Sequence, residues 1–272
     1  MTALWKGRLR VGFLEIPIAL HPGEEPEPVD FTLLDRRDLA PLGHRRVNKN
    51  TGEEVPAEHV VRGFEVEPGR LVTLTDEEIE RLAAERSHRV EVLSFVSPAE
   101  ISPVFYERPY YLEPEAGGEK GYALLREALI RTGRAGIARV LLRTRQHLAV
   151  LLPQDRLLLL NLLRYPSRLR APADLRLPGR DLDALGVAPL EIALAEQLIE
   201  TMAEPWVPAV HRDEFHEELV RYMRHKLLWK EPPAGPAAPA ASVPSATPAD
   251  LPDVLRRSLE RARQERALRR PA

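Results

Sequence analysis

Hydrophobic and polar residues alternate along most of the first 163 residues. In residues 5–13, tryptophan and aliphatic side chains share one parity, and three basic side chains share the other. A period of two is typical of a strand with one buried face. The same alternation, or a short apolar run between turn residues, predicts strands at residues 14–20, 29–33, 58–66, 70–74, 90–96, 104–112, 137–143, 147–152 and 156–163.

Apolar residues three and four positions apart predict helices between and after these strands. Thr75 begins the first helix, because its hydroxyl can accept a hydrogen bond from the Glu78 amide while the Glu78 side chain reaches back. Longer patterns predict helices at residues 122–129, 190–202 and 212–229, and a thinner apolar stripe at residues 254–270. Strands therefore dominate the first part of the chain and helices the second.

Composition narrows the class of protein. The chain has 272 residues, 44% of them hydrophobic, which is enough for a substantial core. The absence of cysteine excludes disulfides, thiolate zinc sites and cysteine nucleophiles. Lys6, Arg8 and Arg10 interrupt the first apolar stretch, and no apolar run has the length of a membrane span. We therefore expect a soluble cytoplasmic protein, associated with the nucleoid if it binds DNA.

The net charge of −2 does not indicate a nucleic-acid partner, but the charges are unevenly distributed. Residues 36–49 carry five basic side chains and one acid among turn residues, and residues 134–145 carry four arginines and no acid. In a regular strand, Arg139, Arg143 and Arg145 would share one face. Both clusters suit phosphate contact, since Lys and Arg there release counterions. Solvated basic loops and an exposed strand face explain them equally well.

No catalytic constellation is visible. Gly117–Lys120 lacks the spacing of a phosphate-binding loop, and no nucleophile motif of a hydrolase occurs. His211, His216 and His225 are five and nine residues apart, so no two of them have the i, i+4 spacing of a metal-binding helix. We therefore expect no enzyme, no cofactor and no metal.

Several segments together resemble bacterial Ku, the DNA-end-binding protein of non-homologous end joining. The resemblance covers about residues 1–230 and is carried by Arg108–Leu112, Gly118–Lys120, Tyr122–Leu129, Gly136–Arg139, Thr51–Pro56, Val60–Phe64 and Leu74–Glu78. It implies an α+β fold, with a Ku-type β-barrel, an inserted bridge over DNA at about residues 35–85 and a helical arm at about residues 190–230. It also implies a homodimeric ring around a double-stranded DNA end. The chain departs from the family in its near-neutral charge and few lysines.

The resemblance also implies candidate contact residues. Those for DNA are Arg36, Arg37, Arg45, Arg46, Lys49, Arg62, Arg70, Arg139, Arg143 and Arg145. Residues 231–252 are rich in Pro and Ala, which predicts a disordered linker before a basic tail at residues 253–272. That tail resembles the segment with which Ku recruits the end-joining DNA ligase, through Leu255, Arg256, Arg257, Leu259 and Arg261.

Three alternatives remain open at this point. The arginines of the tail could instead add non-specific affinity for DNA. The whole protein could be a metal-dependent DNA-processing enzyme, which a divalent-ion-dependent cleavage assay would reveal. It could also be a protein-interaction module that does not bind DNA.

Overall fold

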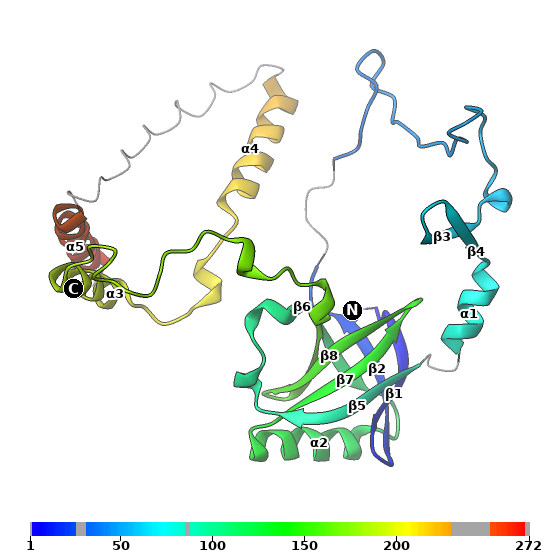
Figure 1. Ribbon diagram of the computed structural model, residues 1–272, viewed down its shortest axis with the longest axis horizontal. Helices are drawn as coiled ribbons and strands as arrows, with labels where there is room; N and C mark the ends of the chain where they lie inside the picture. Colours follow the sequence, from blue (N-terminus) through cyan, green and yellow to red (C-terminus); the bar gives the residue numbers. More distant parts are fainter. Residues whose placement is uncertain (1, 26–30, 85–87, 230–250, 270–272) are drawn as a thin grey trace. The chain divides into compact units, whose positions relative to one another are not determined.

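The computed structural model describes residues 2–25, 31–84, 88–229 and 251–269 (Figure 1). The chain divides into two compact units, Met1–Ala171 and Pro172–Ala272. The first unit contains a closed barrel in the strand order β1-β2-β6-β9-β8-β7-β5. Its strands are β1 (Trp5–Val11), β2 (Leu14–Pro22), β5 (Arg89–Val96), β6 (Tyr106–Pro114), β7 (Ala135–Leu142), β8 (Arg145–Gln154) and β9 (Leu157–Leu163). The expected α+β fold with a β-barrel is confirmed.

The barrel interior is an aliphatic core to which all seven strands contribute. Leu9 and Val90 are completely buried, and so are Ile18, Leu151 and Leu160 on other strands. Removing each such side chain from water stabilises the fold by roughly 1.5–3 kcal/mol. On β1 the outward parity carries Lys6, Arg8 and Arg10, as the alternation predicts.

The barrel closes through the parallel pair β1–β5, which joins segments about 80 residues apart in sequence. Gly7 makes this approach possible, because a Cβ atom there would lie 2.4 Å from the carbonyl oxygen of His88. The Trp5 and His88 rings stack next to it, with their centroids 6.3 Å apart. Any side chain at position 7 would push the two strands apart.

Helix α2 (Glu119–Thr132) runs across the lower end of the barrel as drawn in Figure 1. Its face of Tyr122, Leu125 and Leu129 is buried. The Tyr122 hydroxyl donates a hydrogen bond to the carbonyl oxygen of Leu112 (2.8 Å) and accepts one from the Leu158 amide (2.6 Å). One side chain therefore ties the helix to both β6 and β9.

Residues 31–84, which we call the inserted segment, contain none of this core. The segment holds the hairpin β3 (Arg62–Glu67) and β4 (Arg70–Leu74), followed by α1 (Asp76–Ala84). Thr75 and Glu78 form the predicted reciprocal cap, at 3.2 and 2.9 Å. Among the segment's residues whose side chains are described, none is buried. The predicted strand at 29–33 is wrong over its described residues 31–33, which form no strand. All three are exposed, so their alternation reflects no buried face, although the Leu33 carbonyl accepts a hydrogen bond from the Leu42 amide at 2.8 Å.

The second unit is helical. It contains α3 (Pro189–Met202), α4 (Glu214–Trp229) and α5 (Leu251–Arg269), and α5 packs against α3. Residues 231–250 of the expected linker lie outside the described residues, and α5 already begins at Leu251. Within the described residues, no helix combines the length and apolarity needed to span a membrane.

Candidate nucleic-acid interface

All ten basic residues predicted to contact DNA are exposed. Five precede the hairpin in the inserted segment, two lie on the hairpin strands β3 and β4, and three belong to the β7–β8 part of the barrel. Their electrostatic surroundings differ, and these differences decide which of them can meet a phosphate as an unpaired cation.

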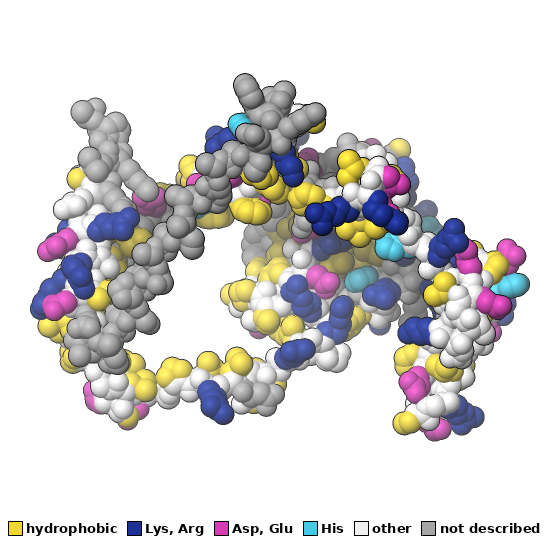
Figure 2. All heavy atoms as spheres, turned by 90° about the horizontal axis from the view of Figure 1, so that it is seen from above, with side chains coloured by type: hydrophobic (Ala, Val, Ile, Leu, Met, Phe, Trp, Pro, Cys, Tyr) yellow, Lys and Arg dark blue, Asp and Glu magenta, His cyan; other side chains and the backbone are white. Residues whose placement is uncertain are grey.

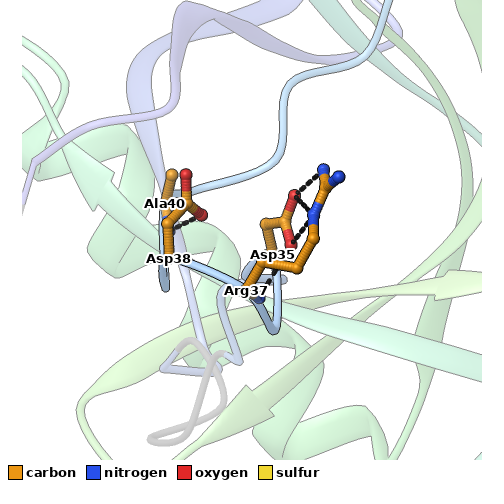
Figure 3. A network of polar contacts seen from close by, with 4 residues as sticks. All are labelled: Asp35, Arg37, Asp38 and Ala40. Carbon is orange, nitrogen blue, oxygen red and sulfur yellow. Dashed lines mark hydrogen bonds and ion pairs between the residues drawn. The ribbon is translucent and has the colours of Figure 1, made fainter.

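Asp35 holds Arg37 in a tight local ion pair (Figure 3). The Arg37 Nε donates to both carboxylate oxygens (3.0 and 3.1 Å) and its Nη2 to Oδ2 (2.6 Å). The Arg37 amide also donates to Oδ1 at 2.9 Å. The Arg37 side-chain hydrogen bond, followed by that from its amide, lowers the pKa of Asp35. The guanidinium is thus already neutralised by an acid that lies just before the basic stretch.

Four further predicted residues are also paired with carboxylates. The pairs are Arg45–Glu54 (3.3 Å), Arg62–Asp76 (3.1 Å), Arg70–Glu67 (3.6 Å) and Arg139–Glu91 (3.0 Å). Exposed pairs of this kind contribute about 0–1 kcal/mol, so a phosphate can displace the carboxylate. The phosphate would nevertheless gain less binding free energy at such a pair than at an unpaired cation.

The other five predicted residues make no ion pair within the described part of the chain. They are Arg36, Arg46, Lys49, Arg143 and Arg145. Three of them lie in the inserted segment: Arg36 and Lys49 in turns, and Arg46 directly before the isolated bridge of Val47 with Glu54. The inserted segment therefore supplies most of the unpaired positive charge among the predicted contacts.

The predicted shared face of Arg139, Arg143 and Arg145 is wrong. Strand β7 ends at Leu142, and Arg143 lies in the turn before β8 with a φ of 56°. Arg145 then pairs directly with Leu142, whose side chain is buried. Residues of the same parity share a face only within one continuous strand, and the turn after Leu142 interrupts that alternation. Of the three residues, only Arg139 therefore lies on the outer parity of β7.

Arg139 instead belongs to a shallow hollow on the outside of the barrel. The cross-strand register places Arg10 of β1 opposite Glu91 of β5, and Glu91 opposite Arg139 of β7. Arg89 also lines the hollow and makes no ion pair with any described residue. Three arginines and one glutamate leave this hollow with a net positive charge. It is suited to an anion such as a phosphate.

Sequence reasoning omitted two of these arginines from its candidates. Arg10 shares the outward parity of Lys6 and Arg8, a signal that was visible in the pattern. Arg89 directly precedes a buried strand residue, but nothing local indicates that β5 adjoins β1. Only barrel closure brings the two together.

Basic and acidic side chains are interspersed on the face that Figure 2 shows. Figure 2 shows Lys and Arg in separate groups, with Asp and Glu between them on the face in view. This interspersed pattern agrees with the net charge of −2. A polyanion would therefore be held by several local contacts and not by a strong overall field.

The five predicted tail residues all lie on α5. Leu259 is only 5% exposed and Leu255 is half-buried. Arg256 pairs with Asp253 at 3.1 Å, and the Arg257 Nε donates to the Asp253 carbonyl at 3.3 Å. The two leucines are thus covered rather than presented to another protein.

Comparison with known proteins agrees with this architecture. A family model described as the Ku70/Ku80 beta-barrel domain matches residues 10–186. The chain is 36% identical over 224 residues to the non-homologous end joining protein Ku of Coxiella burnetii, covering 82% of each protein. It is 38% identical over 261 residues to the protein of that name from Pseudomonas aeruginosa, covering 94% of this chain and 87% of that one. The corresponding Cupriavidus necator protein is 39% identical over 225 residues, covering 82% of this chain and 66% of that one.

Proposed function

The chain belongs to the Ku family, and from this premise we propose that it binds the ends of double-stranded DNA in non-homologous end joining. The observation that carries the proposal is the set of exposed basic residues on the inserted segment and on the outer barrel wall. Side chains on loops and strand faces can reach phosphates without reading base edges. Binding would then be independent of sequence, as a protein that acts on any broken end requires.

We further propose that two copies form a ring around the duplex. The inserted segment supports this, because a two-stranded hairpin is marginally stable by itself and Phe64 on β3 is 66% exposed. Helix α4 also has an uncovered apolar side, with Phe215 at 75% and Leu227 at 83% exposure. Apolar surface of this extent indicates a protein partner, and a second copy would cover it.

A ring also accounts for the modest charge of the chain. A protein that encircles DNA is retained by topology, so its phosphate contacts need to position the duplex more than to hold it. Arg36, Arg46 and Lys49 would supply such contacts first, since they have no carboxylate to exchange within the described residues. Each phosphate neutralised adds about 0.9 to the slope of log K against log salt.

The direct test compares linear duplex with closed circular DNA of the same sequence. The full-length protein should bind the linear form, and after ligation of the linear form into a circle it should stay on that circle. It should fail to load onto circles that were closed beforehand. Equal binding to both forms would contradict the ring, while absence of binding to either would contradict DNA binding itself.

We propose, finally, that α5 recruits the DNA ligase of the end-joining pathway. An amphipathic helix with Leu255 and Leu259 on one side is the kind of segment that binds in a hydrophobic groove. A chain truncated after Lys230 should bind linear DNA within a few-fold of the full chain but lose ligase stimulation. If DNA binding collapsed in parallel with stimulation, the arginines of α5 would be a DNA clamp instead.

A further inference from the structure

Helix α5 lies against α3 through a continuous stripe of side chains. Leu259 is the most deeply buried of the described residues of the second unit. The side chains of α5 that are shielded with it recur at helical spacing: Val254, Leu255, Ser258 and Ala262. On α3 the shielded residues include Leu194, Ala195 and Leu198, whereas Ile199 on another side is 67% exposed. The two helices thus bury their facing stripes against one another.

The charges of the two helices are complementary. Helix α3 carries three glutamates and no base, whereas α5 carries six arginines and three acids over Leu251–Arg269. Glu196 and Glu200 of α3 line the same hollow as Arg263 and Arg266 of α5. An acidic helix is therefore matched to a basic one along their line of contact.

A directed hydrogen bond fixes how the helices align. The Arg266 Nη1 donates to the backbone carbonyl of Thr201 at 3.2 Å. Thr201 lies in the last turn of α3, where carbonyl oxygens lack helical partners and the helix dipole attracts positive charge. The contact therefore combines apolar burial, charge complementarity and a specific cap.

We propose that α3 is the docking surface for the chain's own α5, and that docked α5 is unable to recruit another protein. The inference rests on the proposed recruitment role of α5. The apolar stripe of α5 is narrow and lies on one side of the helix. Leu255 and Leu259 can therefore pack against α3 or bind in a partner's groove, but they cannot do both at once. For a partner that binds only released α5, the apparent affinity equals the intrinsic affinity multiplied by the fraction of α5 that is released.

We expect the docking of α5 on α3 to be reversible. A single pair of helices forms the contact, and α5 follows α4 after the 21 residues 230–250. Tethering of this length keeps α5 at a high effective concentration near α3, so a weak contact suffices to hold it. Because the charges that face each other across the hollow have opposite signs, we expect the contact to weaken as the salt concentration rises.

The absence of cysteine from the chain permits a direct measurement of docking. In the full-length Leu259→Cys variant, the thiol should react with a maleimide slowly when α5 is docked. Leu251→Cys, at a position 40% exposed, provides the fast reference. Adding Glu196→Arg and Glu200→Arg on α3 should accelerate labelling at position 259 several-fold and leave position 251 unchanged. The matched control is Glu214→Arg with Glu218→Arg, which makes the same charge change on α4.

The second measurement is ligase stimulation by the same α3 variant with Leu259 intact. Release of α5 should raise stimulation several-fold above that of the unaltered chain at equal DNA binding. Unchanged labelling would overturn the docking, and so would a labelling rate that depends on protein concentration, because α5 would then dock on a second copy. Faster labelling without higher stimulation would overturn the competition.

If α5 does not recruit the ligase at all, the experiments give a different result. In that case, truncation after Lys230 would leave ligase stimulation intact, whatever the labelling rates. Where truncation abolishes stimulation but the α3 variant fails to raise it, recruitment stands and the inhibitory role of docking is wrong.

Discussion

Glu91 on β5 holds the guanidinium of Arg139 on β7 at 3.0 Å, across neighbouring strands of the barrel wall. A phosphate that binds Arg139 must therefore compete with the Glu91 carboxylate for the guanidinium. Because both side chains are about half exposed, the pair contributes at most about 1 kcal/mol, and a phosphate can compete for the arginine. In the proposed DNA complex, the carboxylate would thus lower the affinity at a position where the sequence suggests a simple basic contact.

Neutralising that carboxylate should tighten DNA binding. We expect Glu91→Gln to strengthen binding to linear duplex by a few-fold and to steepen its salt dependence, because Arg139 then has only phosphate to pair with. Arg139→Gln should have the opposite effect. Glu127→Gln, which breaks the pair with Arg131 on α2, is the matched control and should leave affinity unchanged. Unchanged affinity and salt dependence in Glu91→Gln would show that the barrel hollow does not face DNA.

The unpaired and paired cations of the inserted segment should differ in their effect on binding. Replacing Arg36, Arg46 and Lys49 by Ala should weaken all duplexes alike and reduce the salt slope by up to about 0.9 for each phosphate that is no longer neutralised. Replacing the paired residues Arg37 and Arg45 should change the slope less per residue, since carboxylates already neutralise them in the unbound protein. Titrations at several salt concentrations give both slopes. Equal slopes per residue would contradict the distinction.

The Tyr122 hydroxyl should matter for stability and not for DNA contact. Tyr122→Phe leaves the buried amide of Leu158 and the carbonyl of Leu112 without this partner, which should lower the free energy of unfolding by about 1–3 kcal/mol. Denaturant unfolding measures the loss. Tyr111→Phe is the control, and DNA binding well below the unfolding midpoint should be the same for both variants. A large binding defect in Tyr122→Phe would indicate that α2 contacts DNA.

His147 on β8 should make stability depend on pH in a defined direction. Burial is the main cause that lowers the pKa of His147 in the folded chain, against a smaller raising effect of Glu107. The unfolded chain then binds more protons between that lowered pKa and the usual value of about 6.5. Stability from this group is complete above about pH 6.5 and is lost as the pH falls towards the folded pKa. His147→Gln should reduce the difference in unfolding midpoint between about pH 7.5 and about pH 5.5.

The dimer should depend on the exposed apolar residues of the inserted segment and of α4. Sedimentation of the unaltered chain at micromolar concentration should show a dimer. Phe64→Ser combined with Phe215→Ser should shift it towards monomer without loss of helical and strand signal. Leu124→Ser, at an exposed position on α2, removes similar apolar surface as a control. A stable monomer in the unaltered chain would exclude both the dimer and the ring.

The sequence by itself determined the features that depend on neighbouring residues. The period-two pattern placed Leu9 inside and Arg8 outside, because strand parity is a property of the backbone. The cap between Thr75 and Glu78 followed from local chemistry in the same way. The ion pair of Asp35 with Arg37 is equally local, because the acid lies only two residues before the arginine.

Tertiary structure alone decided which distant residues meet. Closure of β1 onto β5 brings Arg10 and Arg89 to the hollow around Glu91, and no local pattern encodes that pairing. The docking of α5 on α3 likewise joins segments about 50 residues apart and covers Leu259, which the sequence alone presents as an exposed recruitment residue. Local backbone preference determines which side of an element a residue occupies, but the packing of elements remote in sequence determines whether that side meets solvent, DNA or another helix.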